Sequence, residues 1–141
     1  MSLEETLANT PLMASLDRRT LKRLAEEGKV RTYAPGDVIV REGAPASALY
    51  IITRGTVRVE KAAGDESHQF GTLGPGDFFG ELALIEEHPR SATCIAVTEV
   101  ECVLFVAWEF TALLKEHPQM AIPLMNALIA RLHRREQHLP T

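Results

Sequence analysis

The fold is decided by residues 37–60, which read DVIVREGAPASALYIITRGTVRVE. Three short runs in this stretch are rich in Val, Ile, Thr and Tyr, and glycines lie between them. β-Branched and aromatic residues favour strands, and glycine favours tight turns. We therefore predict strands at Val38–Val40, Leu49–Ile52 and Thr56–Glu60, joined by turns.

The same pattern continues on both sides of this stretch. A further apolar run of strand length covers Cys102–Val106. Turn signals recur from residue 35 onward, at Pro35-Gly36-Asp37, Gly43, Gly55, Gly64-Asp65 and Pro75-Gly76-Asp77. Regular spacing of short strands and turns is typical of all-β sandwiches and barrels. The predicted fold is mainly β, an eight-stranded antiparallel β-barrel over residues 30–107.

Helical patterns flank the strands. Asp17 is a candidate N-cap for a helix over residues 17–27, and a shorter helix is expected ahead of it. A last helical region begins at Trp108, where Pro118 and Pro123 mark helix starts or kinks. We therefore expect helices at both ends of the strand region.

The length of the chain, 141 residues, fits one domain, because single domains cluster near roughly 100 to 150 residues. We divide residues 1–141 into N-terminal helices over 1–29, the barrel over 30–107 and C-terminal helices over 108–141. A net charge of −4 argues against a broad nucleic-acid-binding surface. No apolar stretch approaches the roughly 20 residues of a membrane span, and no secretory signal pattern is present, so we expect a cytoplasmic protein.

The residues that most often hold metals are sparse and badly spaced for that task. Cys94 and Cys102 lack a CxxC spacing, and the five histidines never recur at a ligand spacing such as HxxxH. We expect two reduced thiols in the core and no metal site.

Most of the chemistry lies in residues 79–93, which read FGELALIEEHPRSAT. A helix that opens at Gly80 exposes unpaired N–H groups at its positive end, and glycine lets a ligand approach closely. Arg90 adds a cation able to form two hydrogen bonds, and Ser91 adds a hydroxyl group. Glu81 repels a bare phosphate, so the pattern favours a ligand with both an anion and a hydroxyl group, such as a ribose phosphate.

This segment resembles the phosphate-binding cassette of the cyclic nucleotide-binding domain family, which includes Crp/Fnr-like sensors and protein kinase A regulatory subunits. The motifs that carry the resemblance are FGELALI at 79–85, PRSAT at 89–93, YAPGDVI at 33–39, REG at 41–43 and LGPGDFFGE at 73–81. The family implies a jelly-roll barrel, or double-stranded β-helix, with N-terminal helices. It also implies a short cassette helix within residues 79–93 and a C-terminal helical lid.

The resemblance also implies a role for each cassette residue. Glu81 accepts a hydrogen bond from the ribose 2′-hydroxyl, and the Gly80 backbone lies against the sugar. The Ala83 N–H, the Arg90 guanidinium and the N–H and hydroxyl of Ser91 hold the cyclic phosphate. The full predicted ligand-binding set is Gly80, Glu81, Leu82, Ala83, Arg90, Ser91 and Ala92.

The purine half of the ligand is left open by the sequence. Lids of Crp-type relatives often carry hydroxyl groups, whereas the corresponding positions here are Arg135 and Glu136, which we assign as the purine lid. Ser91 fits either cAMP or cGMP, and family frequency alone favours cAMP.

The predicted function is a sensor or regulatory domain that binds cyclic nucleotide and transmits binding through its C-terminal helix. The alternative is the N-terminal sensory fragment of a Crp/Fnr-type transcription regulator, whose DNA-binding domain would follow Thr141. For this chain alone we expect no nucleic-acid partner and no cofactor besides the nucleotide ligand. Glu81 and His88 have no nucleophile or metal ligands beside them, so we expect no enzyme and assign no catalytic residues.

The last helix carries an a/d-like apolar seam, formed by Ala121, Met125, Leu128, Leu132 and Leu139. This seam packs either on the chain's own barrel or on a second copy of the chain. A homodimer through the C-terminal helix is thus one of two open arrangements.

Overall fold

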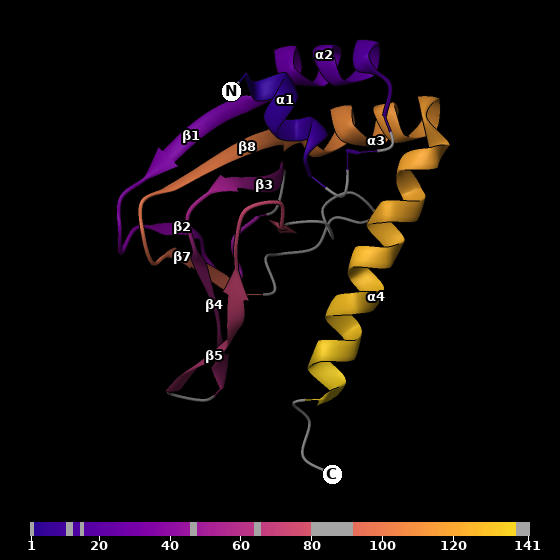
Figure 1. Ribbon diagram of the computed structural model, residues 1–141. Helices are drawn as coiled ribbons and strands as arrows, with labels where there is room; N and C mark the ends of the chain where they lie inside the picture. Colours follow the sequence, from indigo (N-terminus) through magenta and orange to yellow (C-terminus); the bar gives the residue numbers. More distant parts are fainter. Residues whose placement is uncertain are drawn as a thin grey trace.

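The computed structural model describes residues 2–10, 13–14, 16–45, 48–63, 66–79 and 92–137. In these parts of the chain, eight antiparallel strands form two four-stranded sheets, with helices at both ends (Figure 1). The prediction of a mainly β fold with eight strands is confirmed. The strands pair within each sheet, and no pairing within the described ranges joins the two sheets into a closed barrel.

The elements follow one another along the chain in a simple order. The strands are β1 (Lys29–Tyr33), β2 (Val38–Val40), β3 (Ala48–Arg54), β4 (Val57–Ala63), β5 (Glu66–Leu73), β6 (Phe78–Phe79), β7 (Thr93–Ala96) and β8 (Val100–Val106). The helices are α1 (Leu3–Ala8), α2 (Arg18–Glu27), α3 (Ala107–Glu116), the 3-10 helix η2 (Pro118–Met120) and α4 (Ala121–Gln137). Sheet A has the order β1-β8-β3-β6, and sheet B has the order β2-β7-β4-β5.

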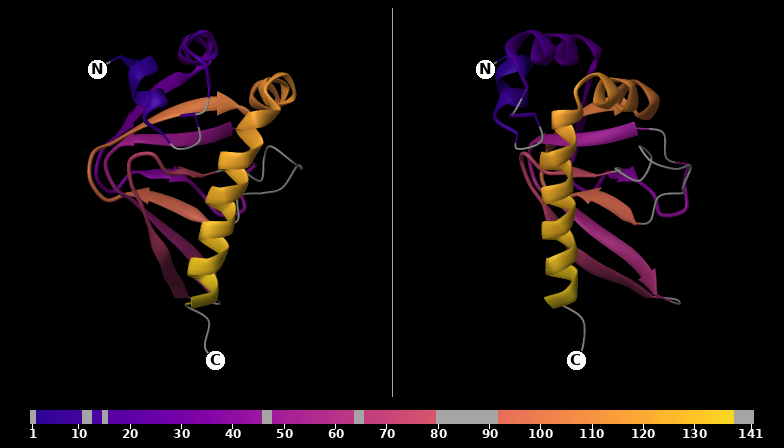
Figure 2. Two further views of the ribbon diagram at one scale, coloured as in Figure 1. Left: turned by 45° about the vertical axis from the view of Figure 1, so that its right-hand side comes forward. Right: turned by 90° about the vertical axis from the view of Figure 1, so that its right-hand side faces the viewer.

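Sheet A is the middle layer of the molecule. Helices α1, α2 and α3 gather over one of its faces, and sheet B covers the other (Figures 1 and 2). Two hydrophobic clusters result, one on each face of sheet A. We call the cluster under the helices the helix-side core and the cluster between the sheets the inter-sheet core.

Successive residues of the sheet A strands alternate between these two cores. In β3, Ile51 belongs to the helix-side core, whereas Tyr50 and Ile52 belong to the inter-sheet core. In β6, Phe78 faces the helices and Phe79 faces sheet B. Because neighbouring side chains of a strand point to opposite faces, a strand buried on both faces must be apolar at every position. This explains the continuous apolar runs in the sequence.

The helix boundaries follow the capping residues. Asp17 precedes α2, and its carboxylate accepts a hydrogen bond from the Thr20 N–H at 2.8 Å, as an N-cap does. Hydrogen bonding by Thr20 lowers the pKa of the Asp17 carboxyl group. Pro118 opens η2, and Pro123 lies in the first turn of α4, where a missing N–H needs no partner. The N-cap and both proline predictions are confirmed.

Helix α4 runs along one side of the two sheets and ends far from α1 and α2 (Figures 1 and 2). Leu124 is buried and Leu128 partly buried in the helix-side core. Met125 is 56% exposed, so it does not pack inward beside Leu124. The apolar stripe is wider than the a/d pattern, and packing of the predicted seam on a second copy of the chain stays a prediction.

Two glycine turns offer a direct test of backbone constraint in this fold. Gly36 and Gly55 have φ values of 91° and 95°, which residues other than glycine rarely adopt. A Cβ atom at Gly36 would meet nothing within 4 Å, whereas one at Gly55 would collide with the backbone oxygen of Glu99. We expect Gly36→Ala to lower the free energy of unfolding by about 1–3 kcal/mol, the usual cost of backbone strain.

Gly55→Ala should cost clearly more, because the backbone at Glu99 must also move. Urea denaturation of both variants measures the difference. Equal losses in the two variants would show that the close approach of Gly55 to the backbone at Glu99 does not constrain the fold.

Candidate functional site

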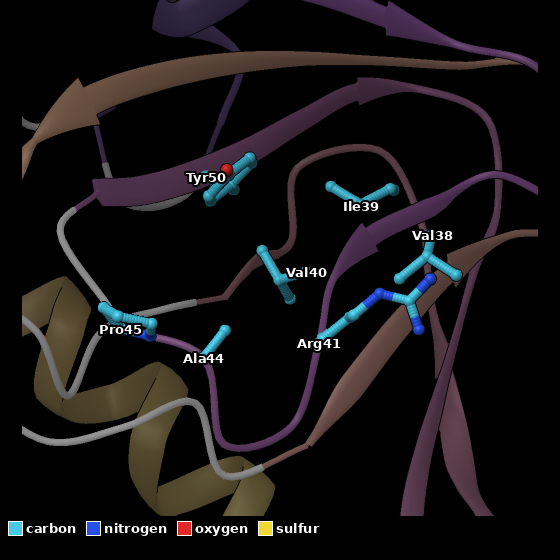
Figure 3. Close-up of a pocket in the computed structure, with 7 residues that line it drawn as sticks. All are labelled: Val38, Ile39, Val40, Arg41, Ala44, Pro45 and Tyr50. Atoms are coloured by element: carbon cyan, nitrogen blue, oxygen red, sulfur yellow. The ribbon is translucent and has the colours of Figure 1, made fainter.

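A pocket with a volume of about 340 Å³ opens beside β2 and β3 (Figure 3). Pockets for small ligands usually have volumes of about 300–1,000 Å³, so this one is large enough for a compact ligand. Its lining residues are Val38, Ile39, Val40, Arg41, Ala44, Pro45 and Tyr50. The lining is largely apolar, with one aromatic ring and one cation.

The aromatic ring and the cation lie on different sides of this pocket. Figure 3 shows Tyr50 reaching from β3 toward Val40, with Ala44 and Pro45 on the turn that follows β2. The guanidinium of Arg41 lies on the other side of β2, near Val38. The part of the pocket beside Tyr50 is therefore lined by an aromatic ring and by aliphatic side chains.

Strand pairing connects the pocket to both ends of the predicted cassette. Tyr50 pairs with Phe79 in sheet A, and Phe79 directly precedes Gly80. Val40 pairs with Cys94 in sheet B, near the end of the cassette. Since paired Cα atoms in antiparallel sheets lie about 4.5–5.5 Å apart, Phe79 and Cys94, which flank residues 80–91 in the sequence, lie beside the pocket walls.

A small hydrogen-bond network holds the turn after β2 in place. The Glu42 N–H donates to the Thr93 hydroxyl oxygen at 2.9 Å. The Glu42 carboxylate accepts from the Ala62 N–H at 3.0 Å. This turn is thereby attached both to β4 and to the first residue of β7, at the point where the chain returns from the cassette.

The inter-sheet core beneath the pocket is dry enough to shift the pKa values of its polar groups. Burial raises the pKa of the half-buried Tyr33, and the nearby Tyr50 and Cys102 add to this effect. Burial also raises the pKa of the Cys102 thiol to about 12. Cys94 and Cys102 are both buried, which confirms the prediction that they lie in the core.

The predicted ligand-binding residues fall almost entirely outside the described residues. Those outside are Gly80, Glu81, Leu82, Ala83, Arg90 and Ser91. Ala92 is described and lies half-buried in a bend directly before β7. Arg135 and Glu136 belong to α4 by their backbone, but their side chains lie outside the described part of the chain. Their assigned roles in ligand binding stay predictions.

Sequence reasoning missed the residues that line the pocket. Val40 and Tyr50 were recognised as strand residues without any role in binding. The continuous run Leu49–Ile52 gives no period-two signal, so the sequence cannot show that Tyr50 faces sheet B and Ile51 faces the helices. The turn residues Ala44 and Pro45 carry no polar group that would have marked them.

Other kinds of site were also sought in the structure. Within the described ranges, no group of three or more His, Cys, Asp or Glu side chains is placed to hold a metal ion. In the same part of the chain, no helix is long and apolar enough to cross a membrane. The cytoplasmic location stays a prediction.

Comparison with known proteins gives a consistent result. A sequence model described as the cyclic nucleotide-binding domain matches residues 30–117. The chain is 37% identical over 112 residues to a cAMP-dependent protein kinase regulatory subunit of Blastocladiella emersonii, covering 79% of this chain and 28% of that protein. It is 27% identical over 138 residues to a CRP-like cAMP-activated global transcriptional regulator of Mycobacterium tuberculosis, covering 97% of this chain and 62% of that protein.

The solved structure of the catabolite activator protein of Thermus thermophilus is similar to this chain with a TM-score of 0.80 and 29% sequence identity. The similarity covers 91% of this chain and 61% of that one. The chain therefore spans less than two thirds of the length of each of these three proteins.

The buried thiol beneath the pocket leads to a prediction about pH. The pKa of Cys102 rises from an ordinary 9.0 to about 12 in the folded protein, so the folded state holds the thiol proton more tightly. This contribution to stability is present below pH 9 and is lost as the pH rises through 12. The free energy of unfolding of the wild type should therefore fall between pH 9 and 11 more steeply than that of Cys102→Ala.

Chemical denaturation at several pH values measures how steeply the free energy of unfolding falls with pH in each protein. The slopes are compared, and not the free energies themselves, because the smaller side chain of Cys102→Ala lowers stability at every pH. Iodoacetamide at pH 8 should label the thiols only after urea unfolds the chain. Parallel pH profiles, or rapid labelling of the folded protein, would contradict the prediction.

Proposed function

Because the chain belongs to the cyclic nucleotide-binding domain family, we propose that its pocket binds a cyclic nucleotide and that cAMP is the preferred ligand. The family is the one that the sequence motifs predicted. Its relatives here are a protein kinase regulatory subunit and a CRP-like regulator, so the chain is a regulatory binding domain and not a catalytic one. Both of these relatives are named for their response to cAMP, which supports the choice of ligand.

The observation that carries this proposal is the strand pairing at the pocket walls. Tyr50 and Val40 pair with Phe79 and Cys94, on either side of residues 80–91. A cassette tethered at these two points has its phosphate-binding residues within reach of a ligand in the pocket. The apolar walls then take the base, and the cassette takes the sugar and phosphate.

Within the cassette we assign the roles by chemistry. Glu81 accepts from the ribose 2′-hydroxyl, because a carboxylate next to the phosphate needs a hydroxyl donor to offset repulsion. Arg90 and Ser91, with the N–H of Ala83, bind the cyclic phosphate through charge-assisted hydrogen bonds. Gly80 lets the sugar approach the backbone.

The base is bound by the walls of the pocket and by α4. The ring of Tyr50 and the side chain of Val40 offer the apolar surface that a purine needs. Arg135 and Glu136, near the end of α4, form the purine lid in this proposal. A guanidinium and a carboxylate there are able to bond either purine, so the preference for cAMP over cGMP rests on the named relatives.

Ligand binding is transmitted to α4 through the helix-side core. Phe78 lies in this core, one residue before Phe79, and it shares the core with Leu124 of α4. A shift at the start of the cassette therefore reaches α4 through packed side chains. Trp108, the only tryptophan of the chain, is 70% exposed at the start of α3, and its fluorescence can report this movement.

We further propose that the chain forms a homodimer through α4. Ile122, Met125 and Ile129 are 62%, 56% and 48% exposed, and they recur at i, i+3 and i+7 along α4. This is the spacing of a helix-to-helix seam, and these three residues lie away from Leu124, which packs inward.

In the alternative proposal, the chain is the sensory part of a Crp/Fnr-type regulator, a class to which the catabolite activator protein belongs.

Calorimetric titration with cAMP and cGMP tests the proposed ligand. We expect saturable binding of cAMP, and Arg90→Ala should weaken it about tenfold or more, because a hydrogen bond to a charged group contributes about 1.5–3 kcal/mol. Arg54→Ala is the control, since Arg54 pairs with Glu99 on the surface at 2.7 Å. Absence of binding to both nucleotides at millimolar concentration would refute the function, and unchanged affinity in Arg90→Ala would refute the site.

Analytical ultracentrifugation tests the proposed dimer. Met125→Glu places a charge in the middle of the exposed α4 stripe and should convert the dimer to a monomer. Val97→Glu is the control, because Val97 is also 43% exposed but lies on a turn between β7 and β8. A wild-type chain that is monomeric with and without cAMP at high concentration would contradict the dimer.

A further inference from the structure

We propose that Tyr50 is a positioning residue, which sets the start of the cassette through its stacking on Phe79. This inference rests on the proposed function, because it concerns how the same pocket recognises its ligand. It adds a role for Tyr50, which lies outside the cassette motifs, and for the ring of Phe79, to which the motifs assign no role in binding.

The two rings are stacked and buried. Their centroids are 4.8 Å apart, and the angle between their planes is 10°. Tyr50 is 8% exposed and Phe79 is 5% exposed, so neither ring is free to move independently. The two residues also face one another as a cross-strand pair of β3 and β6. Stacking thus occurs on top of backbone pairing, and it orients the side chains as well as the strands.

The chain ahead of Phe79 is held by backbone hydrogen bonds. The Gly76 N–H donates to the Ile52 oxygen at 2.8 Å, and the Ile52 N–H donates to the Asp77 oxygen at 2.9 Å. The Asp77 carboxylate accepts from the Gly74 N–H at 2.8 Å. The turn before β6 is therefore fixed on β3.

Strand β6 is only two residues long, so side chains must hold its end. Phe78 inserts into the helix-side core, and Phe79 inserts into the inter-sheet core against Tyr50. Gly80, the first residue proposed to contact the ligand, is bonded directly to Phe79. Holding the Phe79 ring in place thereby limits where the proposed contact residues begin.

Tyr50 contributes to two surfaces at once. Its ring lines the pocket and also stacks on Phe79 (Figure 3). A base that occupies the pocket presses on the ring that orients the beginning of the cassette. Base binding and phosphate binding are thereby coupled through one aromatic pair.

A double-mutant cycle tests this coupling, with the affinity for cAMP as the readout. An aromatic pair contributes about 0.5–1.5 kcal/mol beyond its buried area, so Tyr50→Leu and Phe79→Leu should each weaken binding about 3- to 10-fold. The double variant should lose no more affinity for cAMP than the single variant that binds less tightly, because both substitutions remove the same stack. Tyr50→Phe and Phe79→Tyr keep two rings and should bind like the wild type.

Matched controls lie on the opposite face of β3. Leu49→Val and Ile51→Val change the helix-side core on either side of Tyr50. They should lower the melting temperature and leave the affinity for cAMP within about twofold, which is below the effect expected of an aromatic pair. If Tyr50→Leu does not fold, Tyr50→Met replaces it, since methionine fills a similar space without a ring.

The outcomes separate this proposal from the proposed function. If the wild type binds no cyclic nucleotide, both fail. If the wild type binds and Tyr50→Leu binds equally well, the function stands and the positioning role is wrong. The positioning role is also wrong if Tyr50→Phe loses as much affinity as Tyr50→Leu, because the hydroxyl group and not the stack would then matter. If the fold losses of affinity in the two single variants multiply in the double variant, coupling through the Tyr50–Phe79 pair is excluded.

Discussion

Strands β3, β6 and β8 of sheet A are buried on both faces, and the rest of the structure depends on this burial. One face is covered by α1, α2, α3 and the first turns of α4, and the other by sheet B. Every residue in the centre of these strands must therefore be apolar and must fit a specific neighbour. The strand residues that pack under the helices include Ile51, Phe78, Val103 and Phe105. Sheet B, by contrast, has only one face in the core, and it carries most of the pocket.

This arrangement places the candidate site where the two sheets meet. The site takes one wall from β2 of sheet B and the other from β3 of sheet A, and the cassette connects the same two sheets. A ligand held there contacts both layers at once. Phe78 and Phe79 point to opposite cores, and in the proposed function they carry the effect of binding to the helices and to the pocket. The proposed transmission to α4 needs no separate pathway beyond the packing that already stabilises the fold.

The sequence predicted where helices and strands lie better than it predicted which face of each one packs inward. Strand-forming runs, the Asp17 cap and the helix starts at Pro118 and Pro123 are local signals, and they were read correctly. β6 was not predicted, since two residues give no periodicity, and its identity depends on pairing with β3. The pocket was missed for a related reason, because the role of Tyr50 depends on which sheet faces it. The inward packing of Leu124 on α4 was not predicted, since a wide apolar stripe does not show which edge packs inward. The cassette motifs predicted the family correctly, because they are conspicuous in the sequence without any structure.

The turn after β2 has a consequence for how such a domain changes over evolutionary time. Glu42 fastens the turn, through its backbone N–H and its carboxylate, to the β7 and β4 strands. Among the described residues, the neighbouring pocket residues Arg41, Ala44 and Pro45 belong to neither hydrophobic core. Selection can therefore exchange these side chains, and reshape this side of the pocket, while the scaffold stays intact. This side of the pocket is in this respect an evolvable surface, located in one short turn and separated from the core residues that stabilise the protein.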